Sequence, residues 1–326
     1  MILDVARHKF YEGLITLFVT TMALTIFLIV NSGDGGSAYA SYSPVMSLLS
    51  AVTYDVVFVQ KSIVAILYVV SVLTLSRSTL RTHIYPSDTM ATMSTCAVVM
   101  LPMLATGAAF RESVVVLLGS VALANMFYCF GPHRSMHRLF SAMLAAGLLA
   151  MVEPSLAVVP IAMSVALIVA RKRVREVVVV VVGMLLPIFS CFYIEWLLGV
   201  SFTHSISLWW SSAVKSIDYS ILDSMSIARL IFVAYVLFMQ VVSSVFYFSQ
   251  HDVHSQVMRG AWRSLHLISA VVALALVLLP SASDSLLVVA LLLSSAMLPM
   301  FFVCSGVIIS SICYVVLFLL AIAASI

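Results

Sequence analysis

Residues 171–198 read RKRVREVVVVVVGMLLPIFSCFYIEWLL, a basic cluster followed by a long apolar run. A run of about 20 apolar residues is long enough to cross the hydrocarbon core of a bilayer as a helix. Because Lys and Arg collect on the cytoplasmic side of such helices, the basic cluster also predicts which end stays inside the cell. The stretch therefore predicts one membrane span and its direction.

The composition of the whole chain agrees with this first span. Of its 326 residues, 63% are hydrophobic and 9% are charged, and the mean hydropathy is +1.18. A soluble protein of this composition would have too few polar side chains to cover its surface. We therefore expect an all-α, polytopic transmembrane helical bundle, with residues 1–326 forming a single integral membrane domain. The first helix is expected to remain uncleaved, since acidic residues precede it and no small-residue cleavage site follows it.

Hydropathy divides the chain into about eleven predicted spans. They cover residues 14–30, 56–75, 89–106, 113–131, 139–152, 155–170, 177–198, 228–248, 265–280, 285–303 and 305–324. The spans at 139–152 and 155–170 are short for a bilayer, so the MVEPS sequence between them predicts a tight hairpin or a break within the membrane.

The basic residues follow the alternation that these spans impose. With a cytoplasmic N-terminus, twelve of the sixteen fall inside: Arg7, Lys9, Arg77, Arg81, Arg134, Arg138, Arg171, Lys172, Arg173, Arg175, Arg259 and Arg263. Lys61 falls within a span, which leaves Arg111, Lys215 and Arg229 outside. The pattern predicts a multi-pass membrane protein with a cytoplasmic N-terminus, and it explains the basic cluster at 171–176 without nucleic-acid binding.

The acidic residues gather on the opposite side of the predicted bundle. Eight of the thirteen fall in outer loops or at outer helix ends: Asp34, Asp55, Glu112, Glu153, Glu195, Asp218, Asp223 and Asp284. Topology rules do not require this bias, because acids contribute little to orientation. The residues are either ordinary helix caps or parts of an acidic site that faces outward.

The first outer loop contains the sequence NSGDGGSAYASYSP, residues 31–44. It lacks the lysine of a P-loop and lies on the outer side, which excludes a nucleotide-binding loop. The following residues, SPVMSLLSAVTYD, predict a short helix along the membrane surface. The loop is either a plain connection or one wall of a site that contains Asp34.

A second long outer segment covers residues 197–226. Trp209 and Trp210 fit the aromatic belt at a membrane surface, and their rings could also stack on a sugar. Lys215 could hold a phosphate as a point charge. The combination would suit a lipid-linked phosphosugar.

Lys61 is the cation that the hydropathy pattern places inside a span. A buried charge at that depth requires a partner, and Glu112 and Glu153 are the acids on other helices that we expect to supply it. If the span begins after Lys61, the side chain instead extends to the membrane surface.

The block from Asn125 to Tyr193 resembles an uncharacterised inner-membrane family of the Bacteroidota, known as a domain of unknown function. The shared features are a helix ending near Asn125, a basic loop, paired helices, a basic cluster and the sequence GMLLP. The layout also resembles the membrane module of GT-C glycosyltransferases, in which an acid of the first outer loop acts as base or metal ligand and the sugar donor is a polyprenyl phosphate. That resemblance implies a catalytic role for Asp34 alone. This chain lacks the usual pair of acids in the loop and the large C-terminal outer domain.

Other function classes stay open from the sequence. His133, His137, His251 and His254 have spacings that could serve a metal, but membrane di-iron enzymes use more histidines than these four. Small residues in SAMLAAGLLA (141–150) and LLLSSAMLP would allow close helix packing within the chain or with a membrane-protein partner in envelope assembly. A transporter is a further alternative, although no clear inverted repeat is found. The five cysteines lie in apolar runs without a CxxC spacing, which indicates packing residues.

Overall fold

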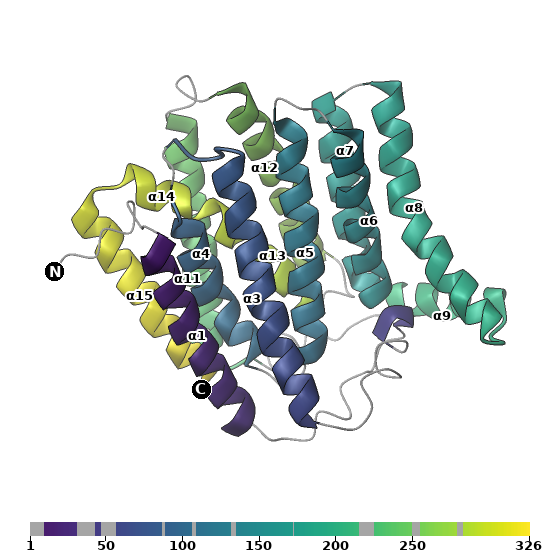
Figure 1. Cartoon of the computed structure of the whole chain (residues 1–326), viewed down its shortest axis with the longest axis horizontal. Helices are drawn as coiled ribbons and strands as arrows, with labels where there is room; N and C mark the ends of the chain where they lie inside the picture. Colours follow the sequence, from purple (N-terminus) through teal and green to yellow (C-terminus); the bar gives the residue numbers. More distant parts are fainter. Residues whose placement is uncertain are drawn as a thin grey trace.

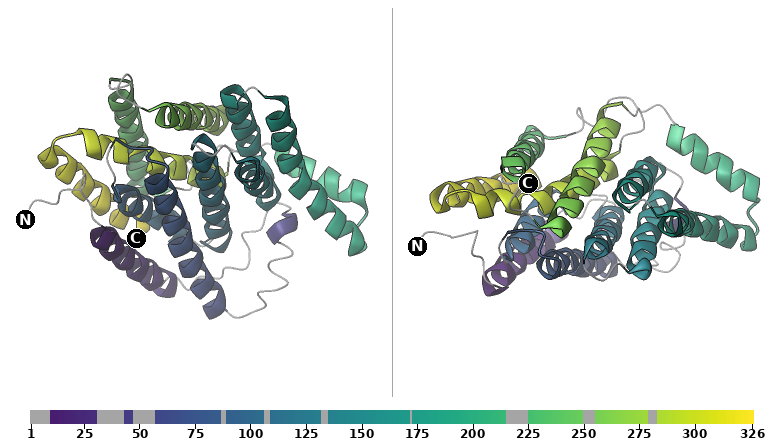
Figure 2. Two further views of the ribbon diagram at one scale, coloured as in Figure 1. Left: turned by 45° about the horizontal axis from the view of Figure 1, so that its top comes forward. Right: turned by 90° about the horizontal axis from the view of Figure 1, so that it is seen from above.

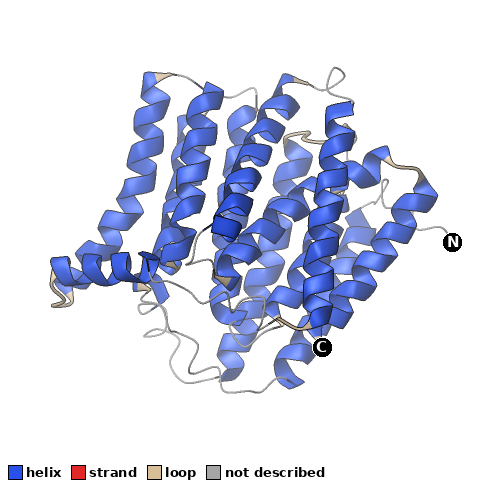
Figure 3. Cartoon of the chain, turned by 180° about the vertical axis from the view of Figure 1, so that it is seen from behind, coloured by secondary structure: helices blue, strands red, loops and turns tan. Residues whose placement is uncertain are grey.

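The computed structural model describes residues 10–30, 43–46, 57–86, 89–105, 109–131, 135–171, 173–214, 225–249, 255–278 and 283–326. Within this part of the chain every regular element is a helix (Figure 3). The elements, in chain order, are α1 (Phe10–Val30), α3 (Val57–Arg81), α4 (Ala91–Leu104), α5 (Ala109–Phe130), α6 (Met136–Val152), the 3-10 helix η2 (Pro154–Ala157), α7 (Val158–Arg171), α8 (Val174–Leu197), α9 (Phe202–Val214), α11 (Ile227–Ser249), α12 (Gln256–Leu278), α13 (Asp284–Met297), α14 (Pro299–Cys304) and α15 (Val307–Ser325). The predicted all-α class is confirmed.

Every predicted span coincides with a helix, but the helices differ in length. Eight described segments have the length and apolar composition of a membrane crossing: Tyr11–Val30, Val59–Arg81, Ala109–Phe130, Val174–Leu197, Ile227–Ser249, Gln256–Leu278, Asp284–Cys304 and Val307–Ser325. Three apolar helices are shorter, Ala91–Leu104, Met136–Val152 and Pro154–Ala170. Length and composition therefore support a multi-pass membrane protein with eight candidate spans, and the predicted count of about eleven is not confirmed.

The helices form one bundle with α8 and α9 at one edge and α1 and α15 at the other (Figures 1 and 2). Two elements occupy its centre. All residues of α4 are buried, and 94% of the best apolar window in Asp284–Cys304 is buried. By contrast, only 28% of the corresponding window of α1, α8, α11 or α15 is buried. These four helices present apolar side chains to the outside, as helices in lipid do.

The central helix is interrupted where α13 ends and Pro299 begins α14. Proline has no N–H to donate, and a carbonyl without a partner is costly away from water. Side chains of other elements replace the missing donors. Thr95 donates to the carbonyl oxygen of Ser295 at 3.2 Å, Tyr85 to that of Ala296 at 2.6 Å and Ser243 to that of Met297 at 2.5 Å.

The paired helices α6 and α7 form a hairpin, as the MVEPS sequence predicts. Glu153 adopts an extended conformation with φ −151° and ψ 129°, which ends α6, and Pro154 then starts η2. A residue before proline is disfavoured in the helical region, so this sequence favours a helix end at Glu153. The hairpin turns well short of the level that α1 and α3 reach (Figure 1).

Candidate functional site

The two ends of the bundle carry different charges. One end, which we call the arginine end, carries eight described cations within about two turns of helix termini: Arg77, Arg81, Arg138, Arg171, Arg173, Arg175, Arg259 and Arg263. The opposite end, which we call the glutamate end, carries Glu112, Glu153, Glu195 and Asp284 together with Lys61, Arg111 and Arg229. In Figure 1 the arginine end is at the top and the glutamate end at the bottom.

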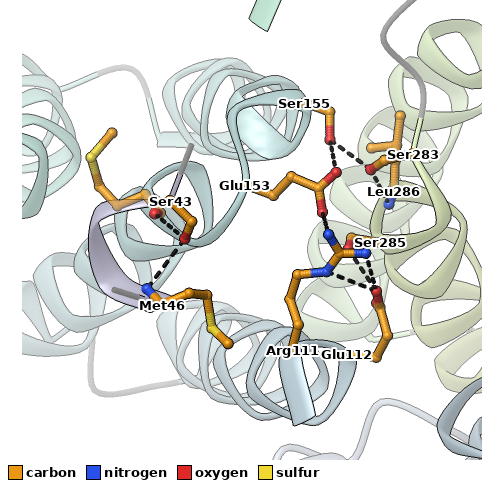
Figure 4. Close-up of polar contacts among 10 residues, drawn as sticks. Ser43, Met46, Arg111, Glu112, Glu153, Ser155, Ser283, Ser285 and Leu286 are labelled. Carbon is orange, nitrogen blue, oxygen red and sulfur yellow. Dashed lines mark hydrogen bonds and ion pairs between the residues drawn. The ribbon is translucent and has the colours of Figure 1, made fainter. Parts of the chain in front are cut away.

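A buried charge cluster lies at the glutamate end, centred on Arg111 (Figure 4). The Arg111 guanidinium donates to Oε1 of Glu112 from Nη2 at 3.1 Å and from Nε at 3.2 Å. Its Nη1 lies 3.7 Å from Oε2 of Glu153, within ion-pair distance. The side chains of Glu112 and Glu153 are 2% and 6% exposed, so both carboxyl groups are removed from solvent. We call these three residues the Arg111 cluster.

Serine hydroxyls complete the surroundings of the two glutamates. Ser285 donates to Oε1 of Glu112 at 2.9 Å, and Ser155 donates to Oε1 of Glu153 at 3.3 Å. The Ser155 hydroxyl also lies 2.7 Å from that of Ser283. The network therefore joins α5, the α6–η2 turn and the start of α13.

One carboxyl oxygen of each glutamate accepts no hydrogen bond from the described residues. Oε2 of Glu112 and Oε2 of Glu153 are buried and have no hydrogen-bond partner among the described residues. Two carboxylates share one guanidinium, which leaves the Arg111 cluster with an excess of negative charge when all three groups are ionised. Asp284 and Arg229 lie close enough for Coulombic interaction with it. A site with unsatisfied carboxylate oxygens is suited to accept a proton or a hydroxyl donor.

These side chains are held in place because they lie at the ends of helices. Arg111 and Glu112 lie in the first turn of α5, where an acid is favourable beside the exposed N–H groups. Ser283 caps the N-terminus of α13 by accepting from the Leu286 N–H at 3.4 Å. Because three helix termini meet here, polar side chains that serve as caps also come together in the cluster.

Two chain segments converge on the last turn of α6, next to Glu153. The carbonyl groups of a last turn lack partners within the helix. The indole Nε1 of Trp209 donates to the Ala150 carbonyl at 3.0 Å, and the Ser43 hydroxyl donates to the Met151 carbonyl at 3.3 Å. Ser43 in turn accepts from the N–H of Met46, which is buried (Figure 4). The end of the first outer loop, the tryptophan segment and Glu153 are thus neighbours.

Trp209 and Trp210 differ in how far their rings are buried. Trp209 is half-buried and packs against a small cluster of Ala150, Met151, Cys191 and Phe192. Trp210 is 63% exposed on the adjacent face of α9. Trp209 therefore fixes α9 to the bundle, and Trp210 is the ring that remains accessible.

Lys61 lies in the second turn of α3 and is partly exposed. Both acids that were expected to pair with it, Glu112 and Glu153, contact Arg111 instead. The described residues contain no ion-pair partner for Lys61. Lys61 lies near the start of the candidate span Val59–Arg81 and not before it, so the alternative in which its side chain extends to the membrane surface stays a prediction.

Several predicted site residues lie outside the described residues. They are Asp34 and Lys215 of the candidate site, and His133, His251 and His254 of the histidine motifs. His137 is exposed in the first turn of α6. The part of the chain that is described contains no group of three His, Cys, Asp or Glu side chains able to hold a metal. All five cysteines are outside any disulfide and are buried or half-buried, in agreement with a packing role.

Sequence reasoning missed the central position of Arg111 and the three serines. A signal was present, because Arg111 stands directly beside Glu112 at the start of an apolar run, one of the few predicted outer-side cations. The chain matches no protein-family model, no curated protein and no solved structure. Its function is therefore argued from its own residues.

Proposed function

We propose that this chain is a multi-pass inner-membrane glycosyltransferase of envelope glycan assembly, similar in arrangement to the GT-C enzymes, with a polyprenyl-phosphate-linked sugar as donor. The arginine end would face the cytoplasm, and the N-terminus with it. The glutamate end would face outward and hold the reaction site at the level of the lipid headgroups.

The convergence at the end of α6 is the observation that carries this proposal. Ser43 at the end of the first outer loop and Trp209 of the tryptophan segment come from distant parts of the sequence, yet they contact consecutive residues of one helix end. The buried Glu153 directly follows that helix end. Buried carboxylates are costly unless they are paired. A plain connection between helices would not require them beside it. Their presence beside two docked surface segments favours a site for a polar headgroup.

The proposed reaction has a simple balance. An acceptor hydroxyl would attack the anomeric carbon of the sugar, forming a new C–O bond and giving its proton to the Asp34 carboxylate. The bond between that carbon and the phosphate oxygen would break, and the phosphate would leave with the bonding electrons. Lys215 would neutralise the charge that grows on the phosphate, and the accessible ring of Trp210 would contact the sugar.

The Arg111 cluster has a positioning role in this proposal. Arg111 fixes the carboxylates of Glu112 and Glu153, and Oε2 of Glu153 remains able to accept from a substrate hydroxyl. Trp209 holds α9 in place beside it. Gly147, in the small-residue stretch 141–150, lies directly against α8.

The test is transfer of labelled sugar from a polyprenyl-phosphate donor into membrane glycan. Asp34→Asn should lower the rate by about 10²–10⁴-fold, the usual contribution of a general base, at unchanged protein level. Glu153→Gln should also reduce transfer, chiefly through substrate affinity. Glu12→Gln in the first turn of α1, at the arginine end, is the control and should leave transfer unchanged. Normal transfer by a well-expressed Asp34→Asn protein would refute the proposed function and leave residues 31–44 as a connecting loop.

A further inference from the structure

Helices α6 and α7 are too short to match the rest of the bundle, including the neighbouring α8 with 24 residues. At a rise of 1.5 Å per residue, α6 with 17 residues is about 26 Å long and α7 with 14 residues about 21 Å. On the same scale α3 with 25 residues extends about 38 Å. A bilayer core of about 30 Å therefore exceeds α6 and α7, although it fits α3.

Helix α9 closes this short sector at the glutamate end. It packs beside η2 and α8, and it runs across the direction of the spanning helices (Figures 1 and 3). The hydrogen bond from Trp209 to the Ala150 carbonyl fixes its height at the last turn of α6. Ala150 lies only about 14 residues, or roughly 21 Å, from the start of α6.

Three stripes of side chains run along α9. One stripe faces the protein and contains Ser205, which is fully buried, with Leu208 and Ser212. The second is apolar and exposed, and consists of Phe202, Ile206 and Trp210. The third is polar and exposed, and consists of Thr203, His204, Ser207 and Ser211. A helix with one apolar and one polar exposed stripe lies in the plane of a membrane surface, with the apolar stripe toward the acyl chains and the polar stripe toward water.

The apolar stripe turns toward the membrane-spanning part of α8. Phe202 packs edge-to-face on Phe192, with ring centroids 6.0 Å apart, and Phe192 lies more than one turn before the end of α8. The polar stripe consequently turns the other way. The boundary between lipid and water along this sector is thus set by α9.

From these lengths and stripes we infer that the sector formed by α6, η2, α7 and α9 thins the bilayer locally, with α9 lying in the displaced headgroup region. Around α3 the bilayer keeps its ordinary thickness. A hydrophobic segment that is too short draws the headgroups toward the centre of the bilayer. The inference concerns the lipid surface as partner and does not depend on glycosyl transfer.

Local thinning has a direct consequence for the Arg111 cluster. Glu153 follows α6 immediately, so it lies at the depth of α9. The end of α6 lies nearer the middle of the bundle than the ends of α1 and α3 (Figure 1). In a bilayer of uniform thickness Glu153 would lie among acyl chains. In the thinned sector it lies at headgroup level, where the polar part of a lipid can approach it from the side.

Nitroxide depth measurements test the inference on the full chain in dioleoyl-phosphatidylcholine vesicles. Single cysteines replace Ile206, Ser207 and Ile66, in a background with Cys304→Ala and Cys313→Ala that keeps the three buried cysteines. Ile206 and Ser207 are neighbours on opposite stripes of α9. Ile66 is 61% exposed on α3 and lies about 15 residues from its end at Arg81, so its height in the bundle is close to that of α9.

Labels at Ile206 and Ile66 should collide more often with oxygen, and the label at Ser207 more often with a water-soluble nickel chelate. Equal oxygen preference at Ser207 and Ile66 would mean that α9 is submerged in a bilayer of uniform thickness, which overturns the inference. Nickel preference at Ile206 would mean that α9 lies in water, which also overturns it. Trp210 and Ser211 give a second pair on the same stripes if a label at the first pair prevents folding.

Discussion

At the scale of single residues, the charge that matters most is Arg111. Its guanidinium lies within ion-pair distance of two acids, Glu112 and Glu153, and both of those acids are buried. Removing one partner of a buried ion pair leaves the other charges uncompensated, which usually costs more than the pair itself contributes. The cluster is therefore expected to be sensitive to changes at its centre.

Arg111→Leu should lower the free energy of unfolding by about 3–5 kcal/mol, measured by denaturation in mixed micelles. The reason is that two carboxylates would remain together without a cation. Neutralising them in the triple variant Arg111→Leu, Glu112→Gln, Glu153→Gln should recover most of the loss. Lys61→Met is the matched control at the same end of the bundle and should stay within about 0.5 kcal/mol of the parent. An Arg111→Leu protein as stable as the parent would contradict the role of the cluster.

The sequence indicated an acidic outer end but not the pairing within it. Glu112 and Glu153 are on different helices, and the contact between Arg111 and Glu153 depends on where the α6–η2 turn packs against α5. Hydropathy also suggested Lys61 as the buried cation, since it counts apolar neighbours and cannot show which face of a helix meets lipid. Only packing distinguishes the half-exposed Lys61 from the largely buried Arg111.

At the scale of elements, α6 approaches α8 closely at Gly147. A Cβ atom at this position would lie 2.5 Å from the Met184 carbonyl oxygen and 2.6 Å from Cγ of Pro187. Neither atom belongs to a flexible side chain, so the helices would have to separate. Small residues at membrane helix contacts allow this close approach.

Gly147→Ala should therefore destabilise the protein by about 1–3 kcal/mol, as overpacked sites do. The measurement is the temperature at which the detergent-solubilised protein loses its monodisperse chromatographic peak. Gly306→Ala provides the control, because an added Cβ there would have no neighbour within 4 Å. Equal stability of the two variants would show that the α6–α8 contact can relax without loss.

Element positions were largely predictable, and element lengths less so. The hairpin at MVEPS was recognisable because a polar residue precedes proline between two apolar runs. The shortness of α4 was not, since the predicted span 89–106 is longer at both ends than the helix, which extends from Ala91 to Leu104. The helical form of residues 202–214 was also not predicted, because its stripes are narrow and its Trp209 anchor is a tertiary contact.

At the scale of the whole molecule, the separation of charge between the two ends predicts its orientation. Loops rich in Lys and Arg remain in the cytoplasm during insertion. Ser211→Cys on the polar stripe of α9 should react with an impermeant maleimide in intact spheroplasts. Val174→Cys at the arginine end, 80% exposed, should react only after the membrane is opened. The reverse labelling pattern would invert the proposed topology.

The interrupted central helix has a consequence for the order of biogenesis. Residues 284–304 are synthesised late, yet they fill the middle of the bundle, and the carbonyls before Pro299 accept hydrogen bonds from Tyr85, Thr95 and Ser243 of earlier segments. Until this segment leaves the ribosome, those hydroxyl groups have no such acceptors, and the apolar faces around them have only lipid or one another to contact. The nascent bundle must therefore remain open at its centre, and its final packing waits for one of the last helices to enter from the side of the insertion machinery.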